Sequence, residues 1–135
     1  IRAGLGRDAQ VHERGAGERE HERREAHLRE RLRLVEHAKA ARSALLTMKG
    51  RALADLGRNF EAVDAFTQAL SLSRDRSDAA VVYFHMGRLC GAMEDFAQAE
   101  SAFAMALQNG LPGGLALQAR EALKGLRERQ APVER

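Results

Sequence analysis

Apolar residues along this chain recur every three or four positions, which is the spacing of amphipathic α-helices. Strand signals are weak, because the longest β-branched run is the pair Val81-Val82. Polar or glycine-containing breaks divide the pattern into segments. Helices are expected over residues 18–42, 44–57, 59–72, 79–93, 94–109 and 111–130. The pattern therefore predicts an all-α protein.

The breaks contain residues that commonly end or begin helices. Gly57 stands at a left-handed C-cap position, and Gly110 with Pro112 two residues later is a strong stop signal. Before the helix that begins near residue 79, either Ser77 or Asp78 can supply the N-cap. These breaks leave tight turns between neighbouring helices, so the helices pair as hairpins.

The N-terminal part divides into two segments of different composition. Residues 1–17 hold four glycines and no hydrophobic period, which predicts a disordered or loosely attached segment. Residues 18–42 form a charged amphipathic helix, which either stands alone or continues into the next helix, because no Gly or Pro intervenes. Its apolar stripe is Leu28, Leu32 and Val35, and its i, i+4 ion pairs are Glu20–Arg24 and Glu25–Arg29. At the other end, residues 131–135 form a tail.

Two stretches of the chain repeat each other. They are GRNFEAVDAFTQAL at 57–70 and MEDFAQAESAFAMAL at 93–107, and one register relates them. Pairs that are 37 residues apart are Gly50 and Gly87, Ala62 and Ala99, Phe66 and Phe103, and Ala69 and Ala106. Self-similarity at such a period indicates stacked copies of one helical hairpin.

This repeat resembles the tetratricopeptide repeat, whose second helix carries Ala-x3-Phe and whose first helix carries Gly. The first unit has Leu46, Gly50 and Leu53, followed by Ala62-x3-Phe66. The second has Tyr83, Gly87 and Cys90, followed by Ala99-x3-Phe103. The resemblance implies a right-handed array of antiparallel helical hairpins over residues 43–76 and 77–110, with flanking helices at both ends.

Small and large residues alternate at the repeat positions, as stacked hairpins require. The glycines and alanines let paired helices approach closely, and Phe66, Phe103 and Tyr83 fill the space between hairpins. The helix at 111–130 is expected to cap the last apolar face. Leu28, Leu32 and Val35 stand 34 residues before Ala62, Phe66 and Ala69. Residues 18–42 are therefore either a degenerate half-repeat or an ordinary flanking helix.

Charge and composition exclude several classes of protein. Residues 1–42 hold 11 Lys+Arg and 8 Asp+Glu, so the whole net charge of +3 lies there. Glutamates interleave with these arginines and no aromatic residue can stack on bases, which argues against nucleic-acid binding. No segment has the roughly 18 apolar residues of a membrane span. We expect a cytoplasmic protein, and the first residue, Ile1, suggests a fragment or a processed product.

Catalytic and metal-binding patterns are missing from the sequence. There is no HExxH, GxGxxG, GKS/T or CxxC motif. The five histidines are not at the i, i+4 spacing that places two metal ligands on one helical face. Cys90 lies among apolar residues and is expected to be a small buried hydrophobe. The sequence therefore predicts no enzyme activity, cofactor or metal.

The resemblance implies a function in protein binding, as an adaptor or scaffold. Ligands of this family bind in a concave groove lined by the first helix of each hairpin. The matching groove positions here are Thr47, Arg51, Phe84 and Arg88. Thr47 and Phe84 replace the lysines of the family's carboxylate clamp, so binding of chaperone C-terminal tails is not expected. Two arginines one hairpin apart instead favour an acidic peptide, with Phe84 for its apolar anchor.

Two other functions remain open at this stage. In one, the N-terminal helix of one copy fills the groove or open end of another, and the protein is a homo-oligomeric scaffold. In the other, the chain is a sensory or linker part of a larger signalling enzyme or transcription regulator.

Overall fold

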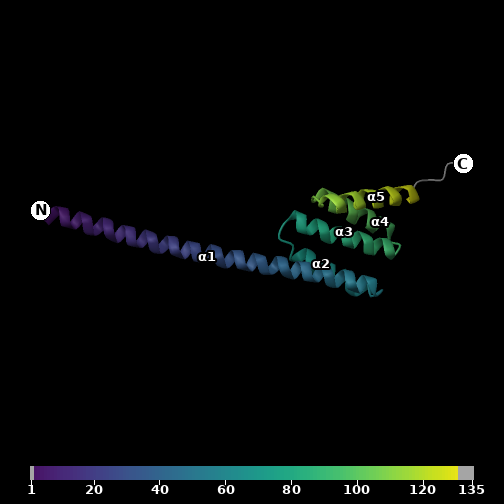
Figure 1. The fold of residues 1–135 in the computed structure, drawn as a ribbon, viewed down its shortest axis with the longest axis horizontal. Coiled ribbons are helices and arrows are strands. Elements are labelled where there is room, and N and C mark those ends of the chain that lie inside the picture. Colours follow the sequence, from purple (N-terminus) through teal and green to yellow (C-terminus); the bar gives the residue numbers. More distant parts are fainter. Residues whose placement is uncertain (1, 131–135) are drawn as a thin grey trace. The chain divides into compact units, whose positions relative to one another are not determined.

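In a computed structural model, the chain is described over residues 2–130, with side chains from residue 15 onward. These residues form five α-helices and no strand, so the predicted all-α array is confirmed. The tail at 131–135 lies outside the described residues. The chain divides into two units, residues 1–37 and 38–135, and the hairpins belong to the second. The helices are α1 (Arg2–Asp55), α2 (Asn59–Ser71), α3 (Arg76–Ala92), α4 (Phe96–Gln108) and α5 (Gly113–Gln130) (Figure 1).

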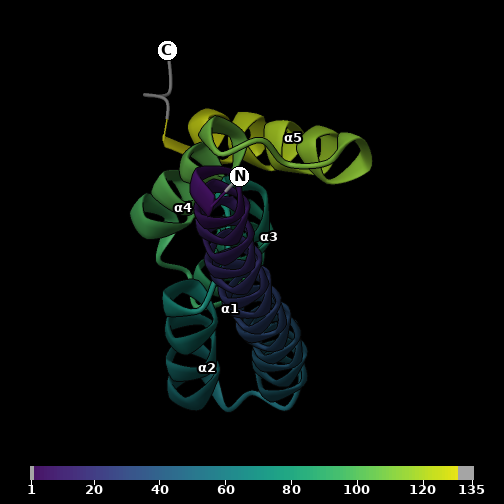
Figure 2. The same ribbon diagram turned by 90° about the vertical axis from the view of Figure 1, so that its left-hand side faces the viewer.

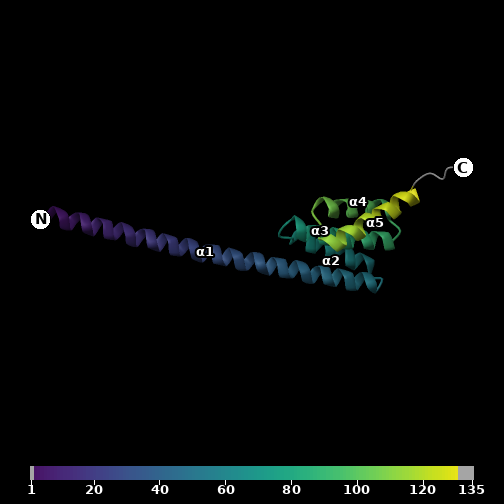
Figure 3. The same cartoon turned by 45° about the horizontal axis from the view of Figure 1, so that its top comes forward.

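The second unit is a stack of neighbouring helices in chain order. Residues 38–55 of α1 and the antiparallel α2 form the first hairpin, joined by a tight turn (Figure 2). Helices α3 and α4 form the second hairpin, and α5 crosses it (Figure 3) at the end away from α2 (Figure 2). Helix α5 contributes buried Ala116, Ala119, Leu123 and Leu126 to this contact. It therefore covers the apolar face that the second hairpin would otherwise expose.

The two hairpin turns have the same backbone geometry 37 residues apart. Gly57 has a φ of 76° and Glu94 a φ of 62°, so both lie in the left-handed region. The amide of Gly57 donates to the Ala54 carbonyl at 3.0 Å, and the amide of Glu94 donates to the Gly91 carbonyl at 3.1 Å. A glutamate in this conformation is unusual, whereas glycine adopts it without steric cost. The repeat thus extends to the backbone, even where the residue type differs.

The second hairpin begins earlier than the sequence indicated. Its N-cap is Asp75, not Ser77 or Asp78, and the Asp75 carboxylate accepts a hydrogen bond from the Asp78 amide at 2.9 Å. Asp75 is extended, with φ −141° and ψ 179°, which is the usual backbone of an N-cap. Helix α4 is capped in the same way, because Asp95 accepts from the Gln98 amide at 3.4 Å.

Each phenylalanine of the repeat lies directly against the glycine of its own hairpin. A Cβ on Gly50 would lie 2.6 Å from Cε1 of Phe66, and one on Gly87 would lie 2.9 Å from Cδ1 of Phe103. Phe66 and Phe103 are only 1% and 4% exposed. Glycine is therefore required at positions 50 and 87 because a ring occupies the space that a side chain would fill.

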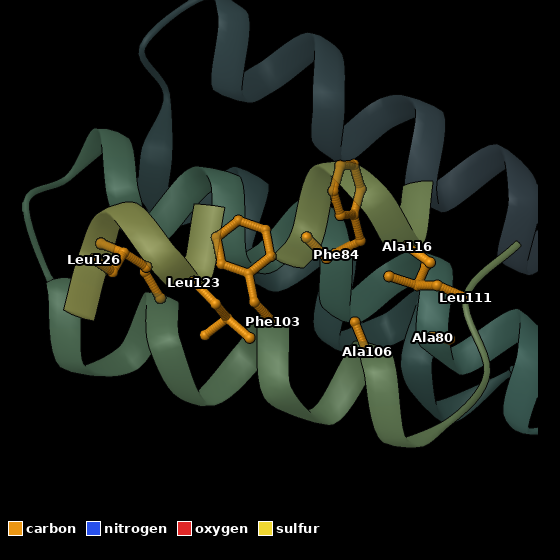
Figure 4. Close-up of a cluster of buried hydrophobic side chains, with 10 residues drawn as sticks. Ala80, Phe84, Phe103, Ala106, Leu111, Ala116, Leu123 and Leu126 are labelled. Carbon is orange, nitrogen blue, oxygen red and sulfur yellow. The ribbon is translucent and has the colours of Figure 1, made fainter. Parts of the chain in front are cut away.

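Two hydrophobic clusters hold the array together. The first joins α1, α2 and α3 and is centred on Phe66, with Leu53, Val82 and Leu89 around it. The second joins α3, α4 and α5, where Phe84 packs edge-to-face on Phe103 with ring centroids 5.8 Å apart (Figure 4). Burying each large apolar side chain contributes about 1.5–3 kcal/mol. Helix α3 belongs to both clusters, so it is the element that connects the hairpins.

Helix α1 differs from the predicted division of the N-terminal part. The structure has one helix from Arg2 to Asp55, including residues 2–17, for which the glycines suggested loose order. No turn separates residues 18–42 from the residues that follow them, so the helix continues into the first hairpin. Within the first unit, Leu28, Leu32 and Val35 are 56%, 64% and 49% exposed. The expected ion pairs Glu20–Arg24 and Glu25–Arg29 are present at 2.9 and 3.0 Å.

His85 is the one histidine buried in the hairpin array over the described residues, with 9% of its surface exposed. Its ring stacks on Phe66 with centroids 6.3 Å apart and meets Phe84 edge-on at 5.3 Å. Burial, with smaller effects from the Arg51 and Arg88 charges, lowers the pKa of His85 to about 4. The imidazole is therefore neutral at pH 7 and serves as a packing residue between the hairpins.

We predict that Gly50→Ala and Gly87→Ala each lower the free energy of unfolding by about 1–3 kcal/mol, because the added methyl group forces the buried ring to move. The matched control is Gly125→Ala in the middle of α5, where a Cβ meets nothing within 4 Å. That change should stabilise by about 0.5–1 kcal/mol through helix propensity. Urea unfolding followed by circular dichroism measures all three. Equal effects at the three positions would contradict the packing assignment.

We also predict that stability falls as the pH drops from about 6.5 towards 4. In the unfolded chain His85 binds a proton near its ordinary pKa of about 6.5, whereas the folded state resists protonation down to about 4. Stability therefore rises with pH across this window and is complete above it. The control is His85→Met, since Met48 occupies the equivalent position of the first hairpin. Thermal unfolding of both proteins across this range should show the steeper pH dependence in the wild type, and identical slopes would contradict the assignment.

Candidate functional site

A pocket of about 200 Å³ lies between the C-terminal parts of α1 and α3. Arg51 and Asp55 line it from α1, and Arg88 lines it from α3. The buried residues Phe66 and Leu89 form part of its lining as well. The structure therefore brings the two predicted groove arginines to one pocket, which holds two cations and one anion.

A second pocket, of about 250 Å³, lies next to the first because Arg51 and His85 line both. Thr47 lines it from α1, and Asp78 and Val81 line it from α3. The Thr47 hydroxyl donates to the Ser43 carbonyl at 2.9 Å, so its hydrogen is already used within α1. We call these two pockets together the α1–α3 groove.

Arg51 and Arg88 are available for a ligand. Both side chains are exposed, and within the part of the chain whose side chains are described neither forms an ion pair with Asp55, Glu94 or any other carboxylate. His85 lines the same pocket as the two arginines, and their charges contribute to lowering the pKa of its imidazole. A carboxylate in the α1–α3 groove could therefore approach either arginine without displacing an internal partner.

Phe84 is not part of this groove, which corrects the sequence-based expectation. It is 2% exposed and lies in the second cluster, edge-on to Phe103 and His85. Thr47 and Phe84 occupy the same position of the repeat, three residues before the glycine. In the first hairpin the short threonine leaves a pocket open, whereas in the second the phenylalanine ring is buried in the core shared with α5. Phe84 therefore cannot anchor a peptide.

The remaining repeat positions are structural. Gly50, Ala62, Phe66, Ala69, Gly87, Ala99, Phe103 and Ala106 are all buried, and Tyr83 is half-buried against the second cluster. Sequence reasoning missed Val81 and His85 as groove-lining residues. Their positions in α3 face the first hairpin, and only the packing of α1 against α3 shows that they border an open space.

A larger hollow, about 590 Å³, lies elsewhere, between α4 and α5. Its lining includes Arg127, which is already paired with Glu100 at 3.3 Å. The sequence-predicted binding residues lie on α1 and α3, and neither of these helices lines this hollow. We therefore take the α1–α3 groove as the candidate site.

Other chemistry finds little support in the described residues. Burial, together with the nearby Asp95 charge, raises the pKa of the Cys90 thiol, so it is protonated at pH 7 and not an activated nucleophile. No group of three His, Cys, Asp or Glu side chains among them is placed to hold a metal ion. In the same residues, no helix is long and apolar enough to cross a membrane.

Comparison with known proteins gives one family. The tetratricopeptide repeat model matches residues 43–76, which are the first hairpin. Neither curated proteins nor solved structures give a significant match. Repeats of this family are protein–protein interaction modules. The first hairpin thus matches the tetratricopeptide repeat, and the second hairpin repeats its turn and its Gly–Phe contact.

Proposed function

We propose that the α1–α3 groove binds an acidic segment of a partner protein, with its carboxylates held by Arg51 and Arg88. The observation that supports this most is that both guanidinium groups line one pocket and neither has an ion-pair partner among the described side chains. Guanidinium and carboxylate form two parallel hydrogen bonds, which gives such a contact direction as well as charge. Asp55 also lines this pocket, and its negative charge repels a ligand carboxylate placed next to it. The ligand carboxylates are therefore expected at separate positions along the groove.

An apolar side chain of the ligand fits the pocket beside Thr47. Ala44 and the Thr47 methyl group offer apolar surface from α1, and Val81 offers it from α3. The proposed ligand therefore has an apolar residue close to its acidic residues. A groove built from only two hairpins contacts a short segment, so we expect modest affinity that depends on ionic strength.

The arginine contacts are tested by Arg51→Glu combined with Arg88→Glu. With a fluorescein-labelled peptide containing several glutamates and one leucine, fluorescence anisotropy should show at least a tenfold loss of affinity, about 1.4 kcal/mol. The matched control is Arg120→Glu with Lys124→Glu on α5, which changes the net charge equally but lies outside the α1–α3 groove. Circular dichroism verifies folding. If the control loses as much affinity as the groove variant, binding depends only on net charge and the proposal is wrong.

The apolar pocket is tested by Thr47→Phe, which copies the residue that stands at the same repeat position in the second hairpin. The ring should occupy the pocket and weaken binding of the leucine-containing peptide at least threefold, about 0.65 kcal/mol. A peptide with alanine in place of leucine should be affected less. Equal loss for both peptides would show that the pocket holds no apolar anchor.

Self-assembly is a second candidate function, favoured by the exposure of Leu28, Leu32 and Val35 on α1. These three residues form a stripe, and glutamates and arginines alternate around it, so two copies can pair without a uniform charge conflict. Light scattering over a concentration series compares the wild type with Leu28→Gln/Leu32→Gln. A monomeric wild type at all concentrations would exclude this function.

A further inference from the structure

The two hairpins differ in whether one particular helix face is covered. In the second hairpin, Val82, His85 and Leu89 of α3 are 2%, 9% and 4% exposed, because they pack against the first hairpin. The residues 37 positions earlier are Leu45, Met48 and Ala52 of α1. Leu45 and Met48 are 64% and 62% exposed, and Ala52 is also exposed. The first hairpin thus presents to solvent the face that the second hairpin buries.

This exposed face continues along α1 as a regular stripe. Its members follow one another at spacings of three and four residues, which is the pattern of a helix that packs against another helix. Ala38, Ala41 and Ala52 are small and allow close approach, while Leu45 and Met48 supply the bulk. We define the open seam as Ala38, Ala41, Leu45, Met48, Ala52 and Leu56, all of which are exposed.

The open seam is separate from the α1–α3 groove. Residues advance by about 100° around an α-helix, so Leu45, Met48 and Ala52 lie nearly opposite Gly50. Gly50 faces Phe66 in the interior of the hairpin, and no residue of the open seam lines either pocket of the groove. A ligand could therefore occupy the seam while the groove remains accessible.

The second hairpin shows what kind of group covers this face. The corresponding residues of α3 belong to the cluster that contains Ala62, Ala65 and Phe66 of α2. The cover thus includes a helix whose buried stripe combines small residues with one phenylalanine, and the Phe66 ring stacks on His85. By the same geometry, the seam fits a helix that presents an apolar stripe.

The charges beside the open seam favour some partner helices over others. Residues 38–56 hold four cations, Lys39, Arg42, Lys49 and Arg51, and one anion, Asp55. Arg42 and Lys49 border the seam, and among the described side chains neither has an ion-pair partner. A second copy of the same face would oppose these cations to each other, whereas an acidic helix would neutralise them.

We infer that the open seam binds an amphipathic helix of a partner protein that carries acidic residues beside its apolar stripe. The partner helix takes the position that α2 takes on α3. The tetratricopeptide hairpins would then have two binding surfaces, one for an extended acidic segment and one for an acidic helix.

The test uses a synthetic helical peptide of about three heptads, with Leu and Ala on its stripe and Glu at the flanking positions. A second peptide differs only in having Lys at those flanks. Fluorescence anisotropy with the full chain should show at least tenfold tighter binding of the Glu peptide. Leu45→Gln with Met48→Gln should weaken that binding at least tenfold, and because both side chains are exposed the fold should be retained.

Two controls separate the seam from other surfaces. Leu117→Gln removes a comparably exposed leucine, 56% exposed, from α5 and should leave affinity for the Glu peptide unchanged. The same comparison is repeated in the Arg51→Glu/Arg88→Glu background, where the α1–α3 groove no longer attracts an acidic peptide, and the loss caused by Leu45→Gln/Met48→Gln should persist there. Equal binding of the Glu and Lys peptides, or unaltered binding by the Leu45→Gln/Met48→Gln variant, overturns the inference. So does a wild-type dimer that this variant dissociates, because a second copy would then be the occupant.

Discussion

The contact between a glycine and a phenylalanine ring in each hairpin is the interaction on which the array depends. Without a Cβ at Gly50 or Gly87, the ring of Phe66 or Phe103 can lie on the backbone of the paired helix. This fixes how closely the two helices of a hairpin approach. Both hairpins use the same contact. Equivalent residues of their first helices, α1 and α3, are therefore 37 positions apart. Arg51 and Arg88 consequently lie along one surface, each directly after its glycine.

Much of this architecture could be predicted because it follows from local spacing. Glycine, alanine and phenylalanine recur 37 residues apart, and a helical hairpin has few other ways to bury them. The stop at Gly57 was equally clear, since glycine adopts a positive φ readily. Asp75 was missed as a cap because several polar residues stand together there, and only the backbone shows which one is extended. The sequence does not decide whether residues 18–42 continue into the next helix. No Gly or Pro interrupts the chain there, but the absence of a helix breaker does not by itself require one continuous helix.

The site was predicted less well, because its open spaces depend on what packs next to each hairpin. Thr47 and Phe84 occupy equivalent positions, yet one lines a pocket and the other is buried beneath α5. Met48 and His85 are also equivalent, and the first is exposed while the second is covered. A repeat pattern assigns each residue to a face of its helix. It does not say whether that face has a neighbour, which depends on the position of the hairpin in the array.

The differences between equivalent residues of the two hairpins also affect the electrostatics of the candidate groove. His85 lies between the hairpins and near both groove arginines, and its low pKa keeps it neutral at any pH well above 4. Arginine keeps its charge over the whole physiological range. Arg51 and Arg88 are therefore the cations that line the groove. In the first hairpin, Met48 at the corresponding position carries no charge, and the cations that border the seam are Arg42 and Lys49. Each surface thus combines positive charge with an apolar contact. The two surfaces differ in shape, because the groove contains pockets whereas the seam is a stripe along one helix, and this difference in shape selects an extended segment for the groove and a helix for the seam.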